Sequence, residues 1–393
     1  MTIMRQGSFS IPPMERVFFG RPFVEVVTEE VERLGAQRIF LLVSNTLNNK
    51  TGEIRRMQDA LGSRFAALYD DIPAHIPRDA VLRAAAVARA AHADLIVTIG
   101  GGSITDAGKN VQLCLEHDIT ELDQFEPFRL KTDPATGVVE APDFRGPTVR
   151  QIAVPTTLSG GEFHQSGGSN DPVNKLKQSI RHPLMIPRTV VFDPALTLHT
   201  PLGLWLSTGM RAVDHAVESF CSPYGSPFVD GTSLQALRTL PEALRRTKRD
   251  PQDLEARANA QSGMWLSQMG MWSLVPMGAS HGIGHVLAGT FNVPHGHCTC
   301  VTLPAVLRFN KPVTEHKQGL LSETLGDGRR EAAELVGELI SDLEMPDRLH
   351  KVGVQRCDFT LVAGNALLDR WTHSNPRKFT SEQEIVELLE TIA

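Results

Sequence analysis

The chain lacks the features that mark membrane, secreted and nucleic-acid-binding proteins. No apolar run approaches the roughly 18 residues of a membrane span, and the N-terminal stretch MTIMRQGSFSIPP does not have the basic and then apolar order of a signal peptide. The basic residues are dispersed, and no basic run contains interleaved aromatic residues. These absences predict a cytoplasmic protein that binds no membrane and no nucleic acid.

Cysteine is also scarce, with five residues in 393 and no framework spacing. In a chain of this size an odd number of cysteines predicts reduced thiols. Cys298 and Cys300 lie just after His295, so one interpretation is a thiolate metal site. The other is that they are small buried residues on a helix that follows His295.

A chain of 393 residues is too long for one ordinary core, so we expect two domains. The composition, 41% hydrophobic and 21% charged with a formal net charge of −6, is typical of a soluble globular protein. We find no internal repeat and no low-complexity tract. The boundary is placed after residue 195, where the pattern of elements changes.

Strands and helices alternate in the first domain, residues 1–195. The pattern predicts helices over 22–34, 50–61 and 79–92 and strands over 38–43, 65–69, 95–99, 151–154 and 189–192. Gly35 is a suitable stop for the first helix. A Pro-, Gly- and Asp-rich stretch between about 117 and 150 is expected as a surface hairpin or long loop. The alternation predicts an α/β domain with a parallel sheet covered by helices.

The second domain, residues 196–393, is predicted to be all-helical. Helical periodicity covers 201–220, 226–246, 253–275, 277–289 and 330–343. A closing helix is expected to run to Ile392. Its N-cap would be Thr380 or Ser381, with Gln383 or Glu384 completing a capping box.

Two loops of the first domain are rich in glycine and small polar residues. GGGSITDAGK, at 100–109, follows a buried strand and opens a helix, so its backbone N–H groups can approach an anion. Phosphate binding is the functional interpretation, and a tight strand-to-helix turn is the alternative. The loop is not a G-x-G-x-x-G fingerprint. PTTLSGGE, at 155–162, ends another strand, and the ends of parallel strands lie side by side where ligands bind.

Histidines are the notable residues of the second domain. His281 and His285 are one helical turn apart and share a face, and His295 returns beyond a turn. Arg211 and His215 lie on an earlier predicted helix. The arrangement can form a metal site or a proton-handling pocket, although single histidines at such places are often ordinary core or surface residues.

Taken together, GGGSITDAGK, PTTLSGGE, GMRAVDHAVE (209–218), HGIGH (281–285) and PHG (294–296) resemble the iron-containing alcohol dehydrogenase family. The resemblance extends from RVFFG at 16–20 to NPR at 375–377. It implies a nucleotide-binding α/β domain, a helical catalytic domain, an active site in the cleft between them, a homodimer, a small-molecule substrate and NADH or NADPH as cofactor. The cofactor-binding residues that it implies are Asn45, Gly100, Gly101, Gly102, Ser103, Asp106, Lys109, Thr156, Thr157 and Ser159.

Asn45 stands where NAD-preferring members of the family carry an aspartate that would repel a 2′-phosphate. Because Asn45 is uncharged, NADPH is permitted and NADH is not excluded. Within the family the chain is most similar to the maleylacetate reductase branch, through IPRTVVFDPALT (186–197) and LAGTFNVPH (287–295). That branch reduces an enone dicarboxylate during aromatic-compound catabolism. Asp106 and Gly296 instead resemble the metal-dependent members.

The chain departs from the family at Arg211. Metal-dependent members have an aspartate ligand there, whereas His215, His281 and His295 match the other three ligand positions for Fe²⁺ or Zn²⁺. A guanidinium cannot be a ligand and would repel a divalent cation. Asp214 projects about 60° from the required direction and is expected to neutralise Arg211 or to point elsewhere.

Carbonyl or enone reduction needs an electrophile for the developing oxyanion and then a proton. We therefore predict a metal-independent reductase with Arg211, His215, His281, His285 and His295 as catalytic residues. Arg211 would hold the substrate oxygen or a carboxylate, and His281 or His285 would deliver the proton. The alternative for Arg211 is a salt bridge to Asp214 or Glu218 without substrate contact.

Other functions remain open. A metal-dependent dehydrogenase would hold its ion at His215, His281 and His295 and act on a different alcohol or aldehyde. The related dehydroquinate synthase fold performs a lyase reaction with recycled NAD, and a non-catalytic descendant is a further alternative. His164 and Lys175 are candidate substrate contacts.

Overall fold

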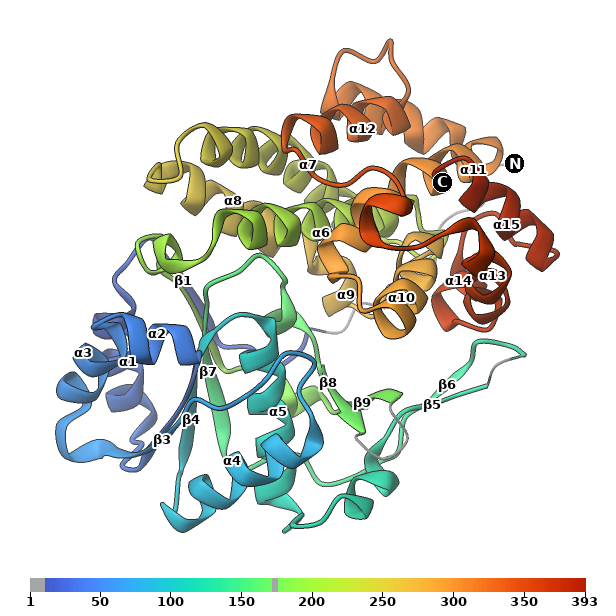
Figure 1. The fold of residues 1–393 in the computed structure, drawn as a ribbon. Coiled ribbons are helices and arrows are strands. Elements are labelled where there is room, and N and C mark those ends of the chain that lie inside the picture. The colour runs from blue at the N-terminus through green and yellow to red at the C-terminus, as the bar shows by residue number, and fades with distance from the viewer. Residues whose placement is uncertain (1–10, 134, 172–175) are drawn as a thin grey trace. The chain divides into compact units, whose positions relative to one another are not determined.

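The computed structural model describes residues 11–133, 135–171 and 176–393, which form two compact units (Figure 1). One unit, which we call the α/β unit, comprises Pro12–Lys131 and Glu140–Pro201. The other, the helical unit, contains Thr132–Val139 and Leu202–Ala393. The chain enters the helical unit at Leu202, whereas the sequence placed the boundary after residue 195. Lys175, a candidate substrate contact, lies outside the described residues.

The α/β unit is built on a six-stranded parallel sheet with the order β1-β10-β7-β4-β2-β3. This confirms the predicted α/β architecture. The strand bounds are Arg16–Phe19 (β1), Ile39–Val43 (β2), Phe65–Tyr69 (β3), Leu95–Gly100 (β4), Arg150–Pro155 (β7) and Thr189–Phe192 (β10). Edge strand β1, whose segment the sequence analysis left unassigned, pairs with β10.

Helices cover both faces of this sheet (Figure 1). Leu41 and its alternate neighbours pack with α1 and α3, whereas Phe40 and Leu42 pack with α4 and α5. Burial on both faces explains why the strands read as continuous apolar runs. The helix bounds are Phe23–Leu34 (α1), Asn45–Lys50 (α2), Glu53–Leu61 (α3), Arg78–Ala90 (α4) and Gly102–Glu116 (α5).

Helix ends in the α/β unit follow the expected signals with one exception. Gly35 closes α1 in the left-handed conformation, with φ of 67°, as predicted. The helix expected from residue 50 to 61 was wrong at its start, because Thr51 is extended and Gly52 is the N-cap of α3. The chain therefore forms two short helices here.

Two small hairpins accompany the sheet. The expected hairpin in the 117–150 stretch is present as β5 (Lys131–Thr132) and β6 (Val139–Glu140). A second, antiparallel pair, β8 (Ser166–Asp171) and β9 (Leu176–Arg181), was not predicted. Its sequence is mostly polar, so it carries no alternation of apolar residues by which a strand is recognised.

The helical unit confirms the prediction of an all-helical second domain. Its helices are Leu202–Cys221 (α6), Pro227–Arg249 (α7), Leu254–Ser267 (α8), Met269–Trp272 (α9), Ala279–Phe291 (α10), His295–Leu325 (α11), Ala332–Asp342 (α12), Phe359–Leu367 (α13), Arg370–Ser374 (α14) and Glu382–Glu390 (α15). Helices α10, α11, α13 and α15 share one apolar core.

Several details of the helical prediction were wrong, and the short helices α13 and α14 were not predicted. The helix expected over 253–275 is divided at Gln268 into α8 and α9. Helix α11 was absent from the predicted helical ranges, although one interpretation of Cys298 and Cys300 placed them on a helix after His295. It contains Pro304 and Pro312, and its first half is buried nearly all round. Ser381 is the N-cap of α15 but makes no capping box. The carboxylate of Glu384 instead accepts from the backbone N–H and hydroxyl of Thr380.

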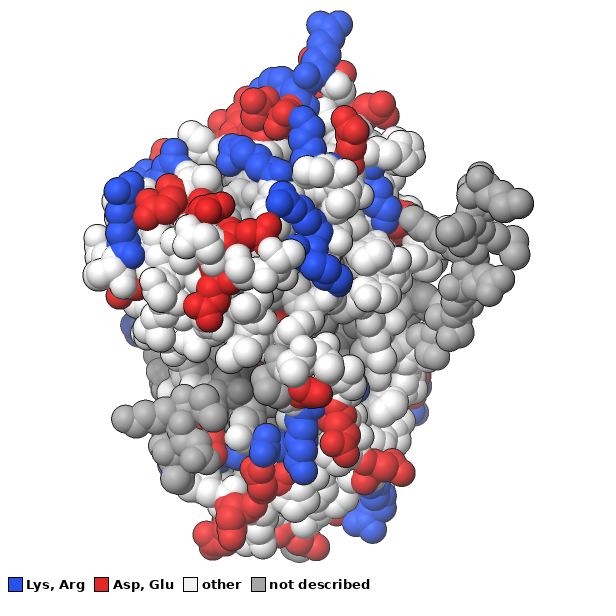
Figure 2. Space-filling model, turned by 90° about the vertical axis from the view of Figure 1, so that its right-hand side faces the viewer, with Lys and Arg blue, Asp and Glu red and all other residues white. Residues whose placement is uncertain are grey.

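Charged side chains of both signs are interspersed over the described residues on the face shown in Figure 2. Ion pairs among the described residues include Arg245 with Asp342 and Lys248 with Glu344. None of the helices that the structure describes is long and apolar enough to cross a membrane.

Candidate functional site

Three loops gather at the carboxyl ends of neighbouring strands β2, β4 and β7. A Cβ atom added at Gly100 would lie 3.3 Å from Cβ of Ser44, which follows β2. One added at Gly101 would lie 3.1 Å from Cγ2 of Thr157, and one at Gly102 would lie 2.6 Å from Oγ of Ser159. The glycines are thus needed for the loops to pack this closely. The predicted proximity of the two glycine-containing loops is therefore confirmed.

The start of α5 at this place has the features of an anion site. Gly101 is the N-cap of this 15-residue helix, and N–H groups in the first turn of a helix have no acceptor within the helix. Ser103 is half-buried, and the hydroxyls of Thr157 and Ser159 lie 2.9 Å apart in the adjoining loop. The arrangement can accept a phosphate. That these residues and Thr156 bind a nucleotide stays a prediction.

Lys109 differs from the expectation that it borders a ligand. Its side chain is 0% exposed, and Nζ donates to Oδ1 of Asp106 (3.2 Å) and to the carbonyls of Gly161 (2.6 Å) and Ser166 (2.8 Å). Three protein oxygens therefore use its donors. Asp106 also accepts from the backbone N–H of Gly168 at 3.2 Å. These two side chains hold the loops and the β8–β9 hairpin together.

Glu162 completes this buried group, which we call the lysine cluster (Asp106, Lys109 and Glu162). Both carboxylate oxygens of Glu162 are buried without a hydrogen-bond partner among the described residues. Burial raises its pKa to about 7, with Lys109 opposing and Asp106 adding to the shift. The sequence analysis gave Glu162 no role of its own.

The predicted cofactor residue Asn45 lies beside a carboxylate. Oδ2 of Asp70, directly after β3, accepts from the side-chain amides of Asn45 (3.4 Å), Asn48 (2.9 Å) and Asn49 (2.8 Å). Asn45, which follows β2, is itself uncharged. The carboxylate of Asp70, which follows the neighbouring strand β3, nevertheless places a negative charge beside it. The two residues lie far apart in the chain, and only the pairing of β2 with β3 brings them together.

Arg211, on α6, faces α10 and α11. Its Nη1 lies 3.8 Å from Oδ2 of Asp214 and 3.5 Å from Oγ1 of Thr299. Nε and Nη2 have no hydrogen-bond or ion-pair partner among the described residues, and neither belongs to the fully buried unpaired atoms. The side chain is 13% exposed. Arg211 thus makes the predicted ion pair with Asp214 but retains donors that a ligand can reach.

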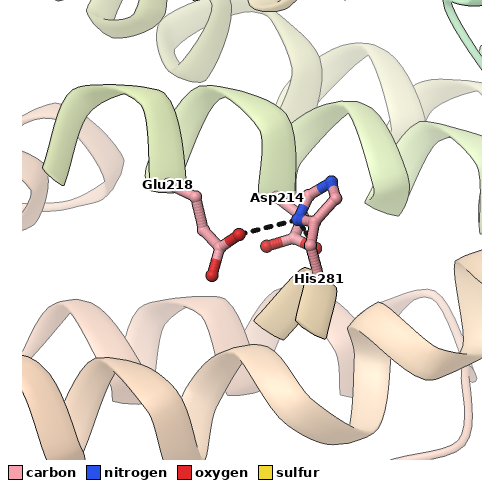
Figure 3. A group of neighbouring side chains, drawn as sticks. All are labelled: Asp214, Glu218 and His281. Atoms are coloured by element: carbon pink, nitrogen blue, oxygen red, sulfur yellow. Dashed lines mark hydrogen bonds and ion pairs between the residues drawn. The ribbon is translucent and has the colours of Figure 1, made fainter. Parts of the chain in front are cut away.

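Two carboxylates of α6 converge on His281 of α10 (Figure 3). Nδ1 of His281 lies 2.7 Å from Oε2 of Glu218 and 3.3 Å from Oδ2 of Asp214. Glu218 also accepts from the backbone N–H groups of Gly278 (2.9 Å) and Ser280 (2.8 Å). Asp214 accepts from the hydroxyls of Thr299 (2.9 Å) and Ser280 (3.1 Å). Arg211, Asp214, Glu218 and His281 together form what we call the arginine cluster.

Burial controls protonation in the arginine cluster. It raises the pKa of Asp214 to about 6, and burial together with the charge of Asp214 raises the pKa of Glu218 to about 8. Burial and the nearby Arg211 charge lower the pKa of His281 well below its usual value. At neutral pH His281 is therefore a neutral imidazole, and its Nε2 is buried without a partner among the described residues.

The other predicted histidines occupy different surroundings. The ring of His215 lies 4.9 Å from that of His281, and its Nδ1 is 2.8 Å from Nε2 of Gln268. His285 is 36% exposed, and its Nδ1 lies 2.9 Å from Oδ2 of Asp369. His295 begins α11 and is half-buried. In the α/β unit, His164 follows the short helix Gly161–Phe163 and is half-buried.

These residues do not fit an ordinary divalent metal site. In the described part of the chain, the one group of three or more potential ligands within 4.8 Å of one another is Asp214, Glu218 and His281, without His215 or His295. Both oxygens of Glu218 and Oδ2 of Asp214 already accept from protein donors, and only Oδ1 of Asp214 has no partner among the described residues. Nη1 of Arg211 lies 3.8 Å from Oδ2 of Asp214. A cation bound by these carboxylates would disrupt their hydrogen bonds and would be repelled by the positive charge of Arg211.

Cys298 and Cys300 are buried in α11, in line with the structural interpretation. Burial raises the pKa of the Cys298 thiol to about 12 and that of Cys300 further. Neither belongs to the group of potential ligands. A thiolate site at this pair is therefore disfavoured.

Sequence reasoning missed several residues that surround the predicted ones. Glu218 follows Asp214 by four residues, so helical spacing could have placed both carboxylates on one face of α6. Gln268, Asp369 and Asp70 carry no such short-range signal. Each reaches its histidine or asparagine from a distant segment of its unit.

Comparison with known proteins assigns this architecture to one family of oxidoreductases. The profile described as "Iron-containing alcohol dehydrogenase" matches residues 13–194. The profile described as "Fe-containing alcohol dehydrogenase family, C-terminal" matches residues 205–393. The chain therefore belongs to the iron-containing alcohol dehydrogenase family, as the sequence motifs indicated, and it is an oxidoreductase.

Its relatives span several activities. The chain is 31% identical to "Dehydrogenase FUM7" of Gibberella moniliformis, with 95% of each chain covered. It is 28% identical to "Maleylacetate reductase 1" of Cupriavidus pinatubonensis, with 93% of this chain and 92% of that protein covered. The solved structure of a 1,3-propanediol oxidoreductase is similar with a TM-score of 0.87 and 27% identity, covering 99% of this chain and 100% of the other.

Proposed function

We propose that the protein is an NAD(P)H-dependent reductase of the maleylacetate reductase type. Its substrate would be a small carbonyl or enone compound that carries a carboxylate. The observation that supports this proposal is Arg211, a mostly buried guanidinium with Nε and Nη2 unpaired among the described residues. A planar pair of N–H donors fits a carboxylate or an oxyanion.

The chemistry follows from that cation. Bound NAD(P)H would supply a hydride to a substrate carbon, and the electron pair of the reduced double bond would move to oxygen. Arg211 stabilises the developing oxyanion or holds the carboxylate next to it. A proton then completes the reduction. Maleylacetate reductases among the relatives support this substrate class.

We further propose that the cofactor binds through the three loops of the α/β unit, with NADH preferred to NADPH. The glycine turn and the N-terminus of α5 would accept the pyrophosphate. Asp70 supports the NADH preference, because its carboxylate lies 3.4 Å from Nδ2 of Asn45 and would repel a 2′-phosphate. The family resemblance also supports a homodimer, which light scattering after size-exclusion chromatography would test.

A metal-dependent alcohol dehydrogenase is the alternative function. It is supported by the 1,3-propanediol dehydrogenase of Klebsiella pneumoniae, which is 29% identical over 94% of this chain and 95% of that protein. Three histidines of this chain stand at family ligand positions. If a metal were bound, it would act as the electrophile that we assign to Arg211.

Elemental analysis combined with an activity assay tests the proposal. Purified protein would be assayed for NADH and NADPH oxidation with maleylacetate, with and without EDTA. We expect turnover that EDTA does not reduce and less than one divalent ion per chain. One bound metal per chain, together with turnover that EDTA abolishes, would overturn metal independence and favour the alternative.

A substitution sharpens this test. Arg211→Asp restores the family's carboxylate one helical turn before His215, so it should allow about one Zn²⁺ per chain to bind. The same variant should lose maleylacetate reduction. Wild-type protein dialysed against Zn²⁺ in parallel is the control.

A further inference from the structure

We propose that Asp369 is a positioning residue that orients His285 as the proton donor of the reduction. The inference rests on the reductase function proposed above. It chooses between His281 and His285, which the sequence left open. It also assigns a role to Asp369, a residue that no sequence motif singled out.

The carboxylate of Asp369 is fixed from two sides. It is the N-cap of α14, where Oδ1 accepts from the backbone N–H of Trp371 at 2.8 Å. Its other oxygen, Oδ2, lies 2.9 Å from Nδ1 of His285. Because an ionised carboxylate only accepts, Nδ1 of His285 carries the hydrogen and Nε2 is the nitrogen left for a ligand.

A glycine in the HGIGH motif makes this contact possible. A Cβ atom added at Gly282 would lie 2.2 Å from Oγ1 and 3.0 Å from the backbone nitrogen of Thr372, in α14. Helix α14 therefore approaches α10 closely at Gly282. This approach brings the N-terminus of α14, with Asp369, alongside His285 one turn further on.

His285 suits proton delivery better than His281 does. His281 is 2% exposed and has its Nδ1 enclosed by two carboxylates, and its pKa is lowered well below the usual value by burial. His285 is 36% exposed, so water can reach its ring. A single aspartate beside it stabilises the imidazolium and fixes the ring orientation.

The proton balance of the step is complete. As hydride from the dihydronicotinamide forms a C–H bond, the cofactor is oxidised and the substrate becomes an enolate or alkoxide. The N–H bond at Nε2 of the His285 imidazolium breaks, and its proton goes to that anion. The neutral imidazole then recovers a proton from water, while Asp369 keeps its hydrogen bond to Nδ1 of His285.

Asp369→Asn tests the inference without removing the helix cap, because asparagine is as good an N-cap as aspartate. With NADH and maleylacetate we expect kcat to fall at least about 10-fold, which is less than the roughly 10²–10⁴-fold contribution of the general acid itself. KM should change little, and the solvent deuterium isotope effect on kcat should rise as proton transfer becomes slower.

A double-mutant cycle distinguishes positioning from general damage. In a His285→Gln background, Asp369→Asn should have no further effect on kcat, because its effect passes through His285. Asp253→Asn is the matched control. Asp253 is the N-cap of α8 in the same unit and accepts from the N–H of Ala256 at 2.9 Å, but it faces Arg246. This control should keep the wild-type kcat.

The outcomes separate the inference from the proposed function. Wild-type protein that oxidises neither NADH nor NADPH with maleylacetate overturns the function and the inference together. An active wild type with an unaffected Asp369→Asn variant overturns the inference alone. Multiplicative losses in the double variant also overturn it, since they would show that Asp369 acts independently of His285.

Discussion

Each unit of the molecule contains a cluster of one cation and two carboxylates, and the two clusters differ in how many donors of the cation the protein leaves unused. In the lysine cluster, Lys109 is 0% exposed and its Nζ donates to three protein oxygens. In the arginine cluster, Arg211 is 13% exposed and holds Asp214 only through Nη1, at 3.8 Å. A cation whose donors are all used by the protein stabilises the fold, whereas one with donors left can bind a substrate.

The carboxylates differ in the same way. Glu218 accepts from two backbone N–H groups and faces His281, whereas both oxygens of Glu162 are unpaired among the described residues. Hydrogen-bonded carboxylates in the arginine cluster fix an imidazole. Both clusters hold carboxylates with raised pKa values, so the stability of each unit depends on pH, and in the lysine cluster this dependence comes from the unpaired Glu162.

Removing the buried lysine should give the largest effect. Lys109→Met leaves Asp106 and two carbonyls without their donor, so the free energy of unfolding should fall by about 3–5 kcal/mol. Urea denaturation followed by circular dichroism measures this. Lys351→Met, at the exposed pair with Asp347 (2.6 Å), is the control and should cost no more than about 1 kcal/mol. Equal losses would show that Lys109 is not a structural cation.

Removing the partly exposed arginine should affect catalysis instead. Arg211→Ala should lower kcat/KM for maleylacetate about 10²–10³-fold, the usual cost of losing an oxyanion donor. Steady-state kinetics measures this. Arg245→Ala is the control, because Arg245 pairs with Asp342 at the surface of the same unit. Unchanged kcat and KM in Arg211→Ala would reduce Arg211 to a salt-bridge partner.

Glu162→Gln should remove a pH dependence of stability. The pKa of Glu162 is about 7 in the fold against an ordinary value of 4.5 for a glutamate. The folded state therefore binds more protons between these values, and stability falls as pH rises from 4.5 to 7. At 1.36 kcal/mol per pKa unit this loss reaches about 3 kcal/mol.

The Glu162 prediction is measured as the difference between two pH profiles. Wild-type protein and Glu162→Gln would be unfolded in urea at intervals between pH 4.5 and pH 8. The variant should gain stability relative to the wild type as pH rises. Parallel profiles would mean that Glu162 does not titrate in this range.

The smallest expected effect concerns cofactor choice. Repulsion between two charges at an exposed site amounts to about 1 kcal/mol or somewhat more, so Asp70→Asn should raise the ratio of kcat/KM for NADPH over NADH about 5- to 10-fold. The control is Asp71→Asn, at the next residue, which is exposed and lies 4.0 Å from Arg83. A ratio that moves equally in both variants would contradict the role of Asp70.

Much of the fold could be predicted from local patterns. Buried apolar strands, the glycine stop at residue 35 and amphipathic helices depend on neighbouring residues, and these elements were predicted correctly. Helix α11 and the β8–β9 hairpin were absent from the predicted ranges for physical reasons. One is buried nearly all round and contains two prolines, and the other is polar, so neither shows the period of its structure.

The sequence by itself determined the residue types of the site, because motifs such as HGIGH and GMRAVDHAVE are local and carry the family assignment. Through the family resemblance it also predicted that Arg211 stands where metal-dependent members carry a ligand. Tertiary structure decided what each residue can do. It buries Lys109 among protein acceptors and brings Glu218 into contact with His281. It also brings Asp369 into contact with His285, and Asp70 into contact with Asn45. Burial shifts the pKa values of these side chains and decides whether their hydrogen-bond donors are used by the protein. It depends on packing between distant segments, which no local sequence pattern records.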